Sequence, residues 1–99
     1  MKITIEKGTD TIISLSGQLD TLTATDFEKE IHDILAGNTS SVILDGSELT
    51  YVSSAGLRLI LTLHKGMIAK SGTFVLRNIK EDIMEIFNIT GFSSFLTIT

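Results

Sequence analysis

The chain has 99 residues, 42% of them hydrophobic, which is enough for one domain with an apolar core and too little for a second. Its 12 acidic and 8 basic residues give a net charge of −4, and no lysine–arginine cluster opposes that sign, so nucleic acid and anionic membranes are disfavoured as partners. There is no cysteine, which excludes disulfides and thiolate metal sites.

The sequence shows neither a signal-peptide pattern nor an apolar stretch long enough to span a membrane. The N-terminal residues alternate between polar and apolar types and contain no apolar h-region of a signal peptide. The most apolar stretch, residues 57–69, is interrupted by Arg58, His64 and Lys65 and is too short to span a bilayer. We therefore expect a cytoplasmic protein.

The first twenty residues predict a β-hairpin. Residues 2–7 alternate with Ile3 and Ile5 on one side, and residues 11–16 place Ile13 and Leu15 on one face. Residues 8–10, Gly-Thr-Asp, form the turn between them. The alternation stops at residues 16–20, where we expect the second strand to end.

From Thr23 onward the apolar spacing becomes helical. The apolar residues recur at intervals of four, three and one, as on the inner face of a surface helix: Phe27, Ile31, Ile34 and Leu35. Thr21 or Thr23 can cap the start of this helix, and Gly37 is expected to end it with a positive φ.

The middle of the chain predicts a buried strand followed by a buried helix. Residues 41–45 are a short, nearly continuous apolar run, which is typical of an inner strand. We expect a loop over residues 46–52 and a helix over residues 53–70. That helix carries two apolar stripes, which indicates a largely buried element. The stripes are Leu57, Ile60, Leu61, His64 and Ile68, and Leu59, Leu63 and Met67.

The last third predicts one more strand, one more helix and a closing strand. Residues 73–77 form the strand, Asn78 is expected to cap the helix, and Gly91 is expected to end it. Its core face is Ile79, Ile83, Ile86 and Phe87, and residues 95–99 alternate as a final strand. The element order is β-β-α-β-α-β-α-β. This predicts a single-domain α/β fold with a mixed sheet, in which only the opening hairpin is antiparallel.

Functional sites in such sheets favour the loops at the carboxyl ends of the strands. The loops over residues 17–22, 46–55 and 78–81 are the candidates, and the middle one ends in Ser53-Ser54-Ala55-Gly56 at a helix start. Ser53 can be a simple N-cap, with Ala55 and Gly56 kept small by close packing. Alternatively, an exposed hydroxyl at a helix N-terminus is a good phosphate acceptor, because the free amides and the helix dipole stabilise the dianion. The tetrapeptide alone leaves both interpretations open.

Three segments in order resemble the STAS family, which includes the bacterial anti-sigma-factor antagonists. They are residues 51–61, Tyr-Val-Ser-Ser-Ala-Gly-Leu-Arg-Leu-Ile-Leu; residues 15–20, Leu-Ser-Gly-Gln-Leu-Asp; and residues 86–92, Ile-Phe-Asn-Ile-Thr-Gly-Phe. Their spacing also matches, so the resemblance covers essentially the whole chain. One feature of many members, a C-terminal helix, has no counterpart before Thr99.

The resemblance implies a protein-binding switch. Alignment on Gly56 places Ser54 at the family's phosphoacceptor position and Ser53 where phosphoregulated members usually carry Asp, which is a departure. The implied partner surface comprises Asp20, Tyr51, Ser53, Ser54, Ala55 and Gly56, on one patch with the loop over residues 46–52. The implied partners are an anti-sigma factor that is also a serine kinase of the histidine-kinase-like (GHKL) type, and a serine phosphatase that resets the switch. We expect the free chain to be a monomer without a cofactor.

Rival functions remain open. A STAS protein could instead be a scaffold in stress signalling or an accessory subunit of a transporter complex, with Ser54 unmodified. A third possibility, an enzyme or nucleotide-binding protein that uses residues 46–55, is weakened because no phosphate-binding glycine motif is present. Asp45 and Glu48 are expected to be solvated, and His32 and His64 share no metal-ligand spacing. We expect no catalytic activity.

Overall fold

The computed structural model describes residues 1–99 and contains one sheet with the strand order β1–β2–β3–β4–β5. Strands β1 and β2 pair in the antiparallel sense, and the other three pairings are parallel. This confirms the predicted mixed sheet and element order. The strands are β1 (Lys2–Glu6), β2 (Thr11–Leu19), β3 (Ser41–Val52), β4 (Thr73–Arg77) and β5 (Thr97–Ile98).

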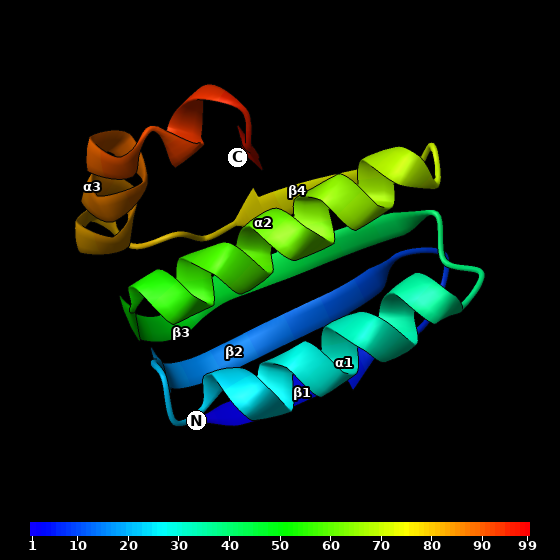
Figure 1. Cartoon of the computed structure of the whole chain (residues 1–99), viewed down its shortest axis with the longest axis horizontal. Helices are drawn as coiled ribbons and strands as arrows, with labels where there is room; N and C mark the ends of the chain where they lie inside the picture. Colours follow the sequence, from blue (N-terminus) through cyan, green and yellow to red (C-terminus); the bar gives the residue numbers. More distant parts are fainter.

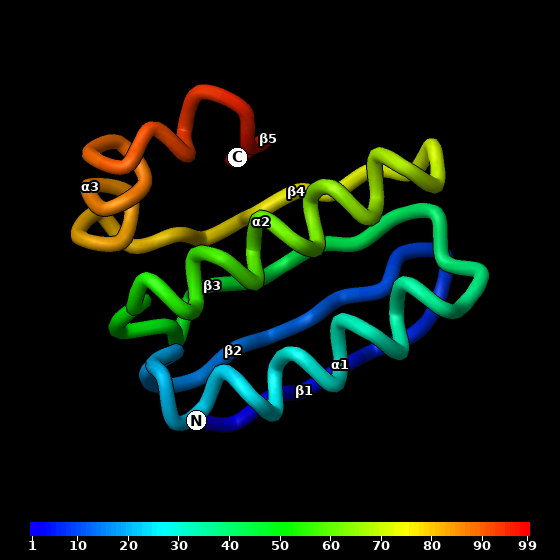
Figure 2. Tube along the Cα trace, viewed as in Figure 1, coloured from blue at the N-terminus to red at the C-terminus, as the bar shows by residue number.

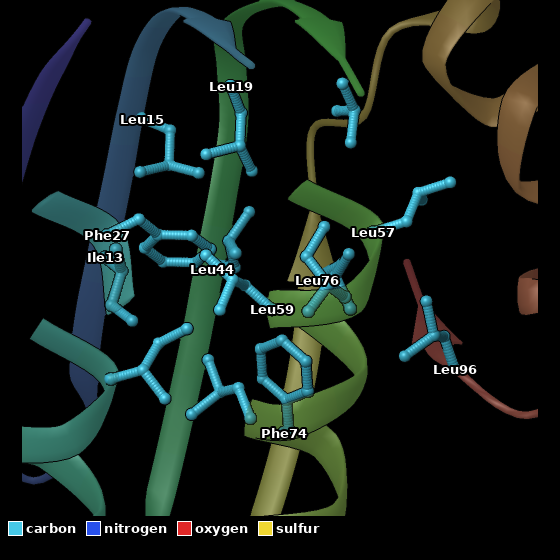
Figure 3. Packing of buried hydrophobic residues seen from close by; sticks show 14 of the residues in the cluster. Ile13, Leu15, Leu19, Phe27, Leu44, Leu57, Leu59, Phe74, Leu76 and Leu96 are labelled. Carbon is cyan, nitrogen blue, oxygen red and sulfur yellow. The ribbon is translucent and has the colours of Figure 1, made fainter. Parts of the chain in front are cut away.

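Two helices, α1 (Ala24–Ala36) and α2 (Ser54–Ala69), lie side by side over one face of this sheet (Figure 1). The third helix, α3 (Glu81–Thr90), and a 3₁₀ turn (Phe92–Ser94) follow β4 and lead to β5. The alternating inner residues of β2, β3 and β4 project toward α1 and α2 and meet side chains such as Phe27 and Leu59 (Figure 3). The helical and strand periodicities of the sequence therefore share one core.

Strands β2 and β3 are both longer than the sequence predicted. The expected break at residues 16–20 and the expected loop over residues 46–52 are wrong, because these two segments pair with each other up to Leu19 and Val52. The register shifts twice along this extension, between Ser14 and Ser16 and between Gly17 and Gln18. Such bulges hide the period-two pattern that identifies a strand in a sequence.

Two helix-end predictions are also wrong: Lys70 bonds to a carbonyl at the end of α1, and Asn78 bonds to Asp45 instead of capping α3. Gly37 ends α1 as expected but with φ −86°, and its carbonyl accepts a hydrogen bond from Lys70 Nζ at 2.8 Å. Asn78 does not cap α3, whose cap position is Lys80. Asn78 has φ 57°, and its side-chain amide donates to Asp45 Oδ2 at 3.1 Å. Gly91 ends α3 with φ 83°, as expected.

The two predicted stripes of α2 are buried for most of their length. Leu57, Leu59, Ile60, Leu63 and Met67 are in the core. Ile68 is exposed, and Leu61 and His64 are half-buried, with the His64 ring 5.1 Å from that of Phe95. The closing strand is shorter than predicted and covers only two residues.

Candidate functional site

The carboxyl ends of β2 and β3 are adjacent, and the starts of α1 and α2 gather at the same end of the molecule (Figure 2). Leu19, the last residue of β2, lies opposite Val52, the last residue of β3. The Ser53 amide donates to the Leu19 carbonyl at 2.8 Å, so pairing continues to the first residue beyond the strand. The two connections that follow, β2–α1 and β3–α2, are therefore held next to each other.

The β3–α2 connection assigns different positions to the two serines. Ser53 is extended, with φ −85° and ψ 174°, and its hydroxyl accepts from the Gly56 amide at 3.2 Å. This confirms it as the N-cap of α2. Ser54 is the first helical residue and is exposed to solvent. No acidic residue lies in the first turn of α2, so no carboxylate there already neutralises the positive end of the helix dipole.

Gly56, in the first turn of α2, is buried. A Cβ at this position would be 2.7 Å from Leu19 Cγ and 3.1 Å from the Leu19 carbonyl oxygen. The first turn of α2 therefore rests directly on the end of β2, as the close-packing interpretation of this glycine predicted.

The β2–α1 connection is a turn organised by one carboxylate. Asp20 Oδ1 accepts from the Leu22 and Thr23 amides, both at 3.0 Å, and from the Thr23 hydroxyl at 3.1 Å. The Thr23 hydroxyl oxygen accepts from the Asp20 amide at 2.9 Å, and its one hydrogen is shared between Asp20 Oδ1 and the Gln18 carbonyl, which lies at 2.8 Å. These bonds, the backbone one from Thr23 foremost, lower the pKa of Asp20. Thr23 thus occupies the cap position of α1, but its side chain serves the turn rather than the helix.

The predicted site residues differ in exposure. Ser54 and Tyr51 are exposed, Asp20, Ser53 and Ala55 are half-buried, and Gly56 is buried. Within residues 46–52 the exposed positions are Ser47, Glu48, Thr50 and Tyr51, whereas Gly46, Leu49 and Val52 point into the protein. Leu22, which the sequence analysis did not single out, is also at this end of the molecule and is 89% exposed. We call Asp20, Leu22, Tyr51 and Ser54 the carboxyl-end surface.

Asp45 is not a freely solvated loop carboxylate. It lies on β3 opposite Arg77 of β4 and accepts from Arg77 Nε at 3.1 Å, Asn78 Nδ2 at 3.1 Å and the Ser47 amide at 2.9 Å. Burial works against these bonds, but together they lower the pKa of Asp45 to about 2. The network joins β3 to Arg77, the last residue of β4. It lies seven residues before the end of β3 and is therefore separate from the carboxyl-end surface.

The loop after β4 does not reach the carboxyl-end surface through the sheet, because β4 pairs with β3 only as far as Asp45. No helix of the chain combines the length and apolarity needed to cross a membrane. No group of three histidine, cysteine, aspartate or glutamate side chains is arranged to hold a metal ion.

Comparison with known proteins identifies the family and the fold. The STAS domain family matches residues 1–99. The candidate anti-sigma factor antagonist BtrV of Bordetella bronchiseptica is 33% identical over 99 residues, which cover 99% of this chain and 85% of BtrV. The structure of a candidate anti-sigma factor antagonist from Thermotoga maritima superimposes with a TM-score of 0.90 at 19% identity, covering 97% of this chain and 84% of the other.

The Bacillus protein SpoIIAA has the same fold in two states. Its unphosphorylated form superimposes with a TM-score of 0.81 at 19% identity, covering 99% of this chain and 87% of SpoIIAA. Its phosphorylated form gives 0.78 at 20% identity, covering 99% and 91%. The fold, the order of the elements and the full-length family match lead to one conclusion: this chain belongs to the STAS domain family.

Proposed function

We propose that this chain is an anti-sigma-factor antagonist that binds its anti-sigma factor through the carboxyl-end surface and is released when Ser54 is phosphorylated. The observation that carries the proposal is the exposed Ser54 at the first position of α2, next to the capping Ser53. The naming of BtrV as a candidate antagonist, at 33% identity over nearly the whole chain, supports the same function. By analogy with the family, the partner is a serine kinase of the histidine-kinase-like type.

The geometry suits a switch without a large conformational change. A phosphate on Ser54 would carry a charge of about −1.5 to −2 at neutral pH. The free amides of the first turn and the helix dipole stabilise that charge in the isolated domain. Inside a protein interface the same charge has to lose its water, and a penalty of ~3 kcal/mol weakens binding by roughly a hundredfold.

The position of the phosphate is the first test. The domain is incubated with ATP and the purified anti-sigma factor that co-purifies with it from its native cell, and the modified residue is located by fragment mass spectrometry. We expect phosphate on Ser54, and we expect Ser53→Ala to be modified as well. The physical reason is that the Ser53 hydroxyl is occupied by the Gly56 amide, whereas Ser54 is exposed. Phosphate mainly on Ser53 would contradict the assignment.

The affinity for the same anti-sigma factor is the second test. We expect Ser54→Ala to bind about as well as the wild type and to remain bound when ATP is added. Ser54→Asp is expected to bind more weakly, because it introduces a charge into the contact. Equal affinities for wild type and Ser54→Asp would remove the electrostatic part of the proposal. Recovery of a transporter subunit or a signalling scaffold, with no phosphate on either serine, would refute the antagonist function itself.

A further inference from the structure

The carboxyl-end surface contains an apolar side chain that the fold does not use. Leu22 is 89% exposed, more than any other large apolar residue of the chain. It lies in the β2–α1 turn, between residues whose side chains are polar. An isolated exposed leucine is common on protein surfaces. Leu22 differs in that its backbone is fixed and its neighbours belong to the proposed binding site.

The turn that carries Leu22 is held from several directions. The Leu22 amide donates to Asp20 Oδ1 at 3.0 Å, the adjacent Thr23 amide donates to the same oxygen, and the Ala24 amide donates to the Asp20 carbonyl at 2.9 Å. A side chain presented by an ordered turn loses little backbone entropy when it becomes buried in a partner. Leu22 therefore has the properties of a preorganised anchor.

The position of Leu22 links it to the phosphoacceptor. Tyr51, 46% exposed, pairs with Gln18 in the strand that leads into the turn, and Ser54 begins the helix that packs on Leu19. Two exposed apolar side chains thus share the end of the molecule that carries the Ser54 hydroxyl. Well-packed apolar and aromatic anchors dominate the energy of many protein interfaces.

We propose that Leu22 is the principal apolar anchor for the anti-sigma factor, inserted into an apolar pocket of that protein, and that Asp20 acts only by holding the Leu22 turn in place. This inference rests on the proposed function and adds the residue and the chemistry of recognition. The Asp20 carboxylate is already engaged by two backbone amides and the Thr23 hydroxyl, so its role is one of positioning. The partner therefore needs an apolar pocket opposite Leu22 rather than a cation opposite Asp20.

The test compares Leu22→Ala with a matched control at an equally exposed apolar position. Ile89 is 79% exposed on α3, outside the carboxyl-end surface, and Ile89→Ala removes a similar side chain. With the purified anti-sigma factor as probe, we expect Leu22→Ala to weaken binding by roughly tenfold or more, as for an interface hot spot. Ile89→Ala should leave the affinity unchanged, and both variants should unfold at the wild-type temperature. Equal affinity for wild type and Leu22→Ala, or an equal loss in Ile89→Ala, would overturn the inference.

A second pair of variants separates positioning from charge at Asp20. Asp20→Asn removes the charge but retains an oxygen that can accept from the Leu22 and Thr23 amides, whereas Asp20→Ala removes the acceptor. If Asp20 acts through the turn, Asp20→Asn binds more tightly than Asp20→Ala, and Asp20→Ala binds as weakly as Leu22→Ala. Equal losses in both Asp20 variants would show that the charge itself contacts the partner and would overturn the positioning role.

The binding experiment also distinguishes this inference from the function on which it rests. If the wild type binds the anti-sigma factor and Leu22→Ala binds equally well, the antagonist function stands and Leu22 is not the anchor. If the wild type fails to bind, the proposed function is refuted, and the inference fails with it.

Discussion

The starts of α1 and α2 lie side by side at the same end of the sheet but are built differently. At α2 the cap residue bonds to its own helix, since Ser53 accepts from the Gly56 amide, and the strand leads into the helix through a single residue. At α1 the cap residue Thr23 bonds instead to Asp20 and Gln18, within a four-residue turn. The first turn of α1 contains the acidic residue Asp26, whereas that of α2 contains none.

This difference matches the roles proposed for the two connections. The short β3–α2 connection holds Ser54 at the start of α2. The first turn of α2 contains no acidic residue, so the helix dipole is free to stabilise an added phosphate. The β2–α1 turn stabilises itself and can therefore expose Leu22 without cost to the core. In the proposed function, the β3–α2 connection carries the switch residue Ser54, and the β2–α1 turn carries the recognition residue Leu22.

Breaking the packing at the α2 start should have the largest effect on stability. Gly56→Val places new atoms against Leu19, including its backbone, and overpacking of this kind costs about 1–3 kcal/mol. Urea-induced unfolding measures the loss. Gly8→Ala is the matched control, because the nearest atom to a new Cβ there is 3.8 Å away, and it should be neutral. Unchanged stability in Gly56→Val would show that the approach of α2 to β2 is not limiting.

Removing the cap tests the assignment of the two adjacent serines. Ser53→Ala leaves the Gly56 amide without its partner and should reduce the free energy of unfolding by about 1 kcal/mol. Ser54→Ala removes an exposed side chain and should change stability by less than about 0.5 kcal/mol. Urea-induced unfolding of both variants measures the two changes in the free energy of unfolding. A larger loss in Ser54→Ala than in Ser53→Ala would exchange the two assignments.

Acid should loosen the Asp20 turn and the Asp45 network through their carboxylates. A folded pKa below the usual value of 3.8 adds stability at higher pH, and this stability disappears as pH falls toward the folded pKa. For Asp45 that pKa is about 2, and after discounting for solvent screening the contribution is on the order of 1 kcal/mol. We therefore expect stability to fall between about pH 4 and pH 2.

The matched variant for the acid prediction is Asp45→Asn, which cannot titrate at this position. Its stability should depend less on pH over the same interval than that of the wild type, as measured by urea unfolding at each pH. An identical pH dependence in both proteins would show that Asp45 does not contribute to the acid transition.

The smallest expected effect concerns the helix dipoles. Ser54→Asp adds a negative charge at the α2 start and should stabilise the free domain by about 0.5 kcal/mol at low salt. Asp26→Asn removes the corresponding charge from α1 and should destabilise it by a similar amount. Both effects should diminish in 1 M salt. A Ser54→Asp variant that is less stable than the wild type at low salt would contradict the view that this helix start accommodates an anion.

The sequence alone determined the order of the elements, the bounds of β4 and the cap of α2. Each depends on local signals, namely the period of the apolar residues and the serine before the helix. The sequence also identified Ser53-Ser54-Ala55-Gly56 as the segment of interest, because a hydroxyl at a helix start has the same local chemistry in any α/β fold. These local signals do not show how far β2 and β3 extend, because that depends on the pairing of two segments far apart in the sequence.

The tertiary structure decided the length of β2 and β3, the hydrogen bonds of Asp20 and the exposure of Leu22. The sequence predicts that a loop begins at Gly46, but this residue lies inside β3, where a Cβ would be 2.7 Å from Ile79 Cδ1. The sequence predicts Asp20 on the partner surface but does not show that its carboxylate accepts from the Leu22 and Thr23 amides of its own turn. The lengths of β2 and β3 and the packing of Gly46 depend on contacts between segments that are far apart in the sequence. Hydrophobic periodicity indicates which side of an element faces the core. It does not indicate which strands pair with each other or which backbone amides donate to a carboxylate.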